Sequence, residues 1–115
     1  MHTLLLLIPP SVDWQRFDQG WPAFLHQAEQ MPGLIREGVF QIQNSLTGQD
    51  PFHRIYSFHF ADQDDLITAM TSTPGKQASQ IIHQITGGKA VILTGKTRED
   101  QPSPPSGSSP STSSP

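Results

Sequence analysis

The stretch FHRIYSFHF, residues 52–60, carries the side chains best suited to chemistry. It alternates as a β-strand does, which places Arg54 and Tyr56 on one face and His59 on the other. An arginine can hold a carboxylate or enolate oxygen, and a tyrosine or a histidine can transfer a proton. By this parity Tyr56 shares a pocket with Arg54, whereas His59 faces the opposite side of the sheet.

Aromatic side chains of a predicted first helix face the same strand and supply the walls that a small-molecule pocket needs. We therefore predict a site with Arg54, Tyr56 and His59 as candidate catalytic residues and Trp21, Phe24 and Phe58 as candidate substrate-binding residues. The same side chains also fit a plain hydrophobic core with Arg54 at its rim, and the sequence leaves this interpretation open.

Other reactive groups lack the spacing that a metal site or a nucleophile requires. The chain has no Cys, and no two of its 5 His residues are spaced as H-x-H or H-x-x-x-H. Asp62, Asp64 and Asp65 are explained by the start of a helix, where carboxylates are stabilised. Ser57 lies outside any G-x-S-x-G motif, which a hydrolase of that type would need. No metal site is predicted.

Composition limits the class of protein and its partners. A chain of 115 residues is typical of one domain, and its 7 Lys and Arg residues against 10 Asp and Glu form no basic block. We therefore expect no nucleic-acid partner; although residues 52–60 resemble an RNA-recognition strand, residues 4–8 lack the aromatic partner. The apolar run 4–8 is also too short for a membrane span or a signal peptide, so we expect a cytoplasmic protein without a membrane partner.

Hydrophobic periodicity and turn residues predict the order β-α-β-β-α-β. The expected elements are a strand at 4–8, a helix at 14–31, strands at 37–46 and 52–60, a helix from 63 interrupted at 73–75, and a strand at 90–93. Gly20 and Pro22 should kink the first helix, with Pro22 beginning its second segment. Pro32 and Gly33 should end that helix in a tight turn.

This order is the split βαβ, or ferredoxin-like, arrangement of α+β proteins, with a four-stranded antiparallel sheet and helices on one face. Strands 4–8 and 90–93 are apolar on both faces, so the face without helices needs a cover. We predict a homodimer in which two sheets pack face to face and form an α/β barrel. Residues 1–98 form the predicted domain, and the Pro/Ser-rich residues 99–115 form a predicted disordered tail.

Several segments also resemble the EthD-like family of the dimeric α/β-barrel group. They are MPGL at 31–34, RIYSFHF at 54–60, ADQDDL at 61–66 and TSTPGKQA at 71–78, and the resemblance covers about residues 1–97. It implies a small-molecule protein, with monooxygenase-like oxidoreductases and isomerases among its relatives. No cofactor is predicted, although haem, which some relatives bind, stays open.

One position departs from the family pattern. Many members carry a His in the first helix eight residues before the Pro of PGL, where this chain has Phe24, and His26 follows two residues later. The family histidine is therefore not carried over. We predict a metal-free enzyme that acts on a small apolar or aromatic compound by proton transfer, isomerisation or cofactor-free oxygenation, in a pocket between the first helix and the sheet. The alternative is a non-catalytic small-molecule-binding or accessory dimer.

Overall fold

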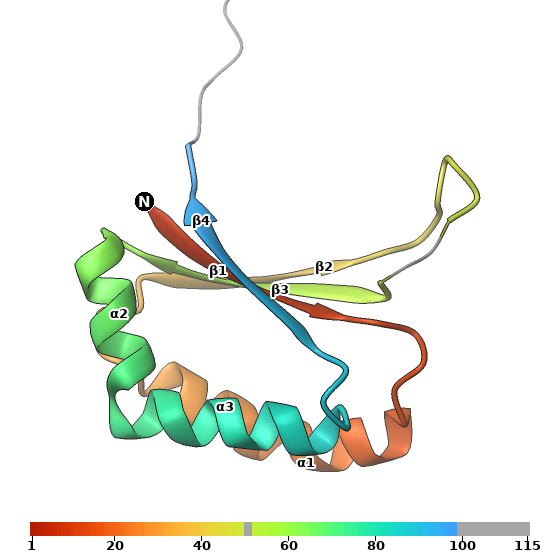
Figure 1. Cartoon of the computed structure of the whole chain (residues 1–115), viewed down its shortest axis with the longest axis horizontal. Helices are drawn as coiled ribbons and strands as arrows, with labels where there is room; N and C mark the ends of the chain where they lie inside the picture. Colours follow the sequence, from red (N-terminus) through yellow and green to blue (C-terminus); the bar gives the residue numbers. More distant parts are fainter. Residues whose placement is uncertain (50–51, 99–115) are drawn as a thin grey trace, which may run out of the picture.

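The computed structural model describes residues 1–49 and 52–98 as one sheet with helices on a single side, as Figure 1 shows. The elements are β1 (His2–Ile8), α1 (Trp14–Glu29), β2 (Arg36–Gln41), β3 (Arg54–Phe60), α2 (Gln63–Thr71), α3 (Thr73–Ile85) and β4 (Val91–Lys96). The predicted tail, 99–115, lies outside the described residues. No helix in the described ranges is long and apolar enough to cross a membrane.

All strand pairs in the sheet are antiparallel, and the strand order is β2-β3-β1-β4. The predicted ferredoxin-like α+β fold is confirmed. The last helical region is divided at Ser72, so the predicted interruption at 73–75 is wrong: these residues form the first turn of α3, where Pro74 needs no backbone N–H. The central strands β1 and β3 are largely buried, whereas every residue of the edge strands β2 and β4 is exposed. The core therefore lies between the central strands and the helices.

Helix α1 begins where the sequence indicates, because the Asp13 carboxylate accepts hydrogen bonds from the backbone N–H groups of Gln15 and Arg16. The predicted division at Pro22 is wrong: the helix is a single element from Trp14 to Glu29 with Pro22 inside it. One missing backbone hydrogen bond costs less than separating the two halves of the apolar stripe from the core.

The turn after α1 forms as predicted. Gly33 has a φ of +79°, a left-handed conformation in which a side chain is strained, and Met31 is buried just before it. The chain reverses here and enters β2, whose residues pair with β3 from Arg36 opposite His59 to Gln41 opposite Arg54.

Strand β2 is shorter than the sequence pattern indicates. It ends at Gln41, one further bond joins Ile42 N–H to the His53 carbonyl, and Leu46 is 100% exposed. The prediction that the strand reaches residue 46 is wrong, because alternation of apolar residues alone does not provide a pairing partner. Strand β4 is longer than predicted and extends to Lys96, because Thr94 and Lys96 continue the ladder with β1.

Candidate functional site

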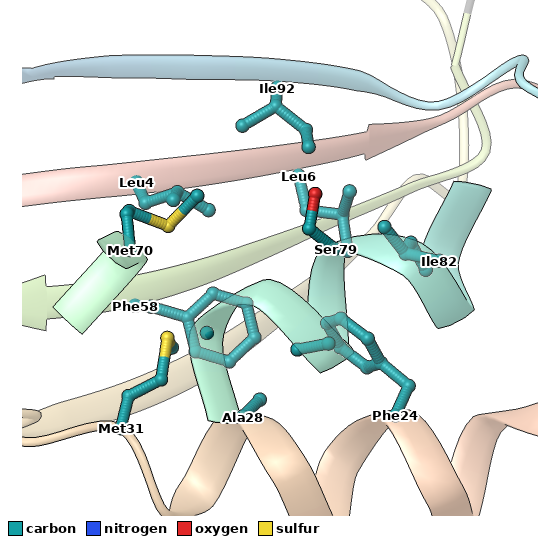
Figure 2. A pocket seen from close by; sticks show the side chains of 12 residues that line it. Leu4, Leu6, Phe24, Ala28, Met31, Phe58, Met70, Ser79, Ile82 and Ile92 are labelled. Atoms are coloured by element: carbon teal, nitrogen blue, oxygen red, sulfur yellow. The ribbon is translucent and has the colours of Figure 1, made fainter. Parts of the chain in front are cut away.

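The space enclosed between the helices and the sheet is almost filled by side chains. Figure 2 shows Phe24 of α1 and Phe58 of β3 pointing into it, with ring centroids 6.1 Å apart. The remaining cavity is about 30 Å³, which holds about one or two water molecules. This interior is a packed core, and a substrate does not fit in it.

A larger hollow lies beside this core, between α1 and the edge strand β2. This α1–β2 groove has a volume of about 300 Å³, at the lower end of the range for small-molecule sites. Its lining consists of Trp21, Leu25, Glu37, Gly38, Val39, Tyr56 and Phe58. Helical spacing of four aligns Trp21 with Leu25, and strand alternation aligns Glu37 with Val39 and Tyr56 with Phe58.

Trp21 is the central aromatic side chain of the groove. Its ring centroid lies 4.3 Å from that of Tyr56 and 4.8 Å from that of Phe24, and it stacks on Phe17 at 5.2 Å. Trp21 is half-buried, whereas Phe17 and Phe24 are buried. The indole is therefore held by the core on one side and borders the groove on the other, as a flat apolar wall for a planar ligand.

Arg54 lies next to this aromatic wall, at the end of β3. Its guanidinium carbon is 4.9 Å from the centre of the Trp14 ring, and its Nη1 donates a hydrogen bond to Tyr56 Oη at 3.4 Å. The tyrosine hydroxyl accepts from the guanidinium and keeps its own proton to donate. Arg54 and Tyr56 thus lie together on the helix side of the sheet, as their shared parity indicates.

Glu37 is a groove residue that sequence reasoning missed. It lies opposite Phe58 in the β2–β3 ladder, so its side chain is on the helix side of the sheet. Burial, the neighbouring Glu29 charge and a hydrogen bond with Glu29 together raise the pKa of the Glu37 carboxyl. The alternation of Glu37 with Val39 could have placed Glu37 on the helix side of the strand. The sequence instead favours the face of Phe40 as the core side, because Phe40 is more apolar.

His59 lies on the other face of the sheet, away from the groove. Its Nδ1 is 3.0 Å from Thr3 Oγ1, its Nε2 is 3.1 Å from Ser57 Oγ, and Thr3 also hydrogen-bonds Thr97. These side chains border a second hollow of about 310 Å³ that opens on the face without helices. His59 therefore cannot reach a ligand in the α1–β2 groove.

The structure thus brings together most of the predicted site residues and separates one. Trp21, Tyr56 and Phe58 line the groove, Arg54 contacts Tyr56, and Phe24 supports Trp21 from the core. Among residues 1–49 and 52–98, no group of three or more His, Cys, Asp or Glu side chains is arranged to hold a metal ion. The groove itself offers a hydroxyl and a carboxyl for acid–base chemistry, and the Arg54 guanidinium beside Tyr56 offers hydrogen-bond donors.

No protein-family model matches the chain, and no curated protein matches it. Solved structures do share its fold. A protein of the ethyl tert-butyl ether d (EthD) family from Bacillus halodurans C-125 is 23% identical with a TM-score of 0.76, over 85% of this chain and 99% of that one. This likeness supports the resemblance seen in the sequence.

Two other structures extend the comparison. SnoaB, a cofactor-independent oxygenase from Streptomyces nogalater, is 11% identical with a TM-score of 0.62, over 89% of this chain and 97% of that one. A dimeric ferredoxin-like protein of unknown function from Thermobifida fusca YX is 12% identical with a TM-score of 0.62, over 84% of this chain and 90% of that one. The shared property is the fold, which serves more than one activity.

Proposed function

We propose that the chain is an EthD-like small-molecule enzyme that works without a metal. Its substrate is a small apolar or aromatic compound, and its reaction is a proton transfer, an isomerisation or a cofactor-free oxygenation. The observation that supports this proposal is the α1–β2 groove of about 300 Å³, with Trp21, Tyr56 and Phe58 in its lining. The shared fold with a cofactor-independent oxygenase adds support for chemistry of this class.

The groove residues have separate roles in this proposal. Trp21 and Phe58 provide apolar walls, and Phe24 holds the Trp21 ring in place from behind. Tyr56 donates a hydrogen bond or a proton to a ligand oxygen, and Arg54 makes that hydroxyl a stronger donor by donating to its oxygen. These are the groups that a developing enolate or phenolate oxygen needs.

We also infer that two copies of the chain pair through the sheet face that carries no helices. Apolar side chains are exposed on this face, with Phe40 at 65%, Leu93 at 50% and Val91 at 38% exposure. Contiguous apolar surface of this kind marks an interaction site in soluble proteins. Several proteins of the same fold are described as dimeric, which supports a homodimer here.

A non-catalytic binding or accessory dimer is the second candidate. The observation that favours it is the packed interior, where Phe24 and Phe58 leave a cavity of only about 30 Å³. On this reading the α1–β2 groove holds a ligand or stays empty, and no turnover depends on Tyr56.

Native mass spectrometry of the protein purified from cells tests the assembly and finds the ligand in one experiment. We expect twice the chain mass of 12.7 kDa, with additional mass that is lost on activation. A measured mass that corresponds to one chain would contradict the homodimer. Once the bound compound is identified, Tyr56→Phe separates the two functions, because an enzyme loses turnover while retaining the compound, whereas a carrier is unaffected.

A further inference from the structure

Glu37 occupies one end of the α1–β2 groove, and the aromatic pair Trp21 and Tyr56 lies further along it. In the β2–β3 ladder, Glu37 is opposite Phe58 and Val39 is opposite Tyr56, which makes Glu37 and Tyr56 diagonal neighbours. Diagonal positions across an antiparallel pair are about 7–8 Å apart, the width of a small ring. Among the described residues that line the groove, Glu37 carries the one carboxyl group.

Glu29 faces Glu37 from the end of α1. It follows Leu25 by four residues and Trp21 by eight, so these three side chains form one stripe along the helix, and the first two of that stripe, Trp21 and Leu25, line the groove. Partial burial and the nearby Glu29 side chain raise the pKa of the Glu37 carboxyl. Glu37 is therefore a carboxyl group of raised pKa beside an apolar, aromatic wall.

We propose that Glu37 is the proton-transfer residue of the α1–β2 groove and that the substrate is a small planar ketone with an acidic C–H group between its carbonyl and a conjugated ring. This inference rests on the groove being the binding site of the proposed function. Trp21 and Phe58 select a flat ring, Tyr56 binds its oxygen, and Glu37 faces the proton that is removed.

The step balances without a further reactant. The Glu37 carboxylate takes a proton from the carbon beside the carbonyl, and the electron pair of that C–H bond forms the carbon–carbon double bond of an enolate. The charge moves to the oxygen, where the Tyr56 hydroxyl donates a hydrogen bond while accepting one from Arg54. The Glu37 carboxylic acid then returns the proton to the same carbon or to a conjugated one, which gives exchange or isomerisation with no change in oxidation state.

The raised pKa of Glu37 supports this role. A general base works best when its pKa is close to the operating pH, and burial and Glu29 move the carboxyl in that direction. The groups that face Glu37 across the groove are Glu29, which raises its pKa, and Tyr56, whose hydroxyl Arg54 contacts. The base form is present only above the raised pKa, so exchange should increase as pH rises through it.

The test uses 2-tetralone, a small bicyclic ketone with an acidic C–H group beside a ring. Its hydrogen–deuterium exchange in D2O is followed by proton NMR with the full chain, and its binding is followed by line broadening in the same spectra. We expect faster exchange than in buffer alone, and a loss of at least about 100-fold in that acceleration in Glu37→Gln with binding unchanged within about threefold.

Two further variants make the result specific. Asp18→Asn changes an exposed carboxyl of α1 outside the groove and should leave exchange unchanged. Glu29→Gln removes the neighbouring charge and should move the increase in exchange to lower pH, which a purely structural Glu37 would not produce.

Each outcome distinguishes this inference from the proposed function. If 2-tetralone binds but its exchange does not depend on Glu37, the inference is wrong and the groove remains a binding site. If it does not bind at millimolar concentration, the inference about planar ketones is wrong, and the proposed function is tested by the compound that native mass spectrometry identifies. If the acceleration of hydrogen–deuterium exchange is lost in Glu37→Gln and retained in Asp18→Asn, the result supports both the inference and the proposed function.

Discussion

The two faces of one sheet differ in this protein although their apolar residues are similar. On the helix side of β1, Leu4, Leu6 and Ile8 are at most 5% exposed. On the other side of β1, Leu5 is half-buried and Leu7 is 9% exposed. The edge strands differ less between the faces: Val39 and Ile92 on the helix side are 63% and 41% exposed, and Phe40 and Leu93 on the other side are 65% and 50% exposed. The helices therefore bury the central strands and leave the edge strands exposed on both faces.

The open face is also graded from apolar to polar along the strands. One cross-strand row consists of Phe40, Ile55, Leu7 and Val91. Four residues further along the strands, the corresponding row consists of Arg36, His59, Thr3 and Gly95. A second sheet that packs on this face would therefore cover the apolar row and leave the polar row at the margin or paired across the interface.

Leu6→Ala compared with Leu5→Ala is the most direct test of the difference between the faces. Leu6 is 1% exposed and packed under the helices, so its truncation should lower the free energy of unfolding by about 2–5 kcal/mol. Leu5 is half-buried on the open face, and its truncation should cost less than half as much at low protein concentration. Urea unfolding at a low and a high protein concentration measures the loss of stability in each variant. Equal losses for Leu5→Ala and Leu6→Ala in dilute protein would contradict the comparison.

Phe40→Asp should act on assembly rather than on folding. A carboxylate on the open face opposes the burial of that face, so the dissociation constant of the proposed homodimer should rise by at least about 100-fold. Leu46→Asp is the control, because Leu46 is 100% exposed and lies beyond the end of β2. Sedimentation of the two variants gives the result, and unchanged assembly in Phe40→Asp would place the interface elsewhere.

Thr3→Val should have a smaller effect, confined to the polar row. It removes the hydroxyl 3.0 Å from His59 Nδ1, which leaves a buried ring nitrogen without that partner and costs about 1–3 kcal/mol. The α1–β2 groove lies on the opposite face, so ligand binding there should not change. Thermal unfolding and groove binding are measured together, and a change in binding would show that the two faces are coupled.

The smallest predicted effect is a decrease in the free energy of unfolding with rising pH that arises from Glu37. Its pKa is raised above the ordinary 4.5, so the folded state binds this proton more tightly than the unfolded state. The resulting stabilisation is full below the unfolded pKa and is lost as pH rises through the folded one. Glu37→Gln should remove this decrease, and parallel pH profiles for the variant and the wild type would contradict the shift.

The sequence was sufficient for the fold because the strongest signals are local. The apolar stripe of the first helix and the Gly33 turn each depend on a few neighbouring residues, and both form as predicted. The parity of β3 also correctly separated Tyr56 from His59, since alternation is a property of one strand.

The groove could not be predicted in the same way, because it depends on the position of one element against another. Phe40 is more hydrophobic than Glu37, yet Glu37 lies on the helix side, since the register with β3 and the place of α1 decide which side of β2 is covered. The early end of β2 and the uninterrupted helix through Pro22 likewise depend on tertiary pairing and packing that no local pattern contains.

Gly20 determines which wall of the groove can move. A side chain at this position would lie 2.2 Å from Ile85 Cγ2, so α1 and α3 meet here without room between them, and α1 is a fixed wall. The opposite wall, β2, is an edge strand that pairs with β3 in the sheet, and each of its residues is exposed. If a ligand enters the groove as proposed, we expect local opening of β2 to limit its entry and release. Its residence time would then depend on hydrogen bonds of the β2–β3 ladder that do not contact the ligand.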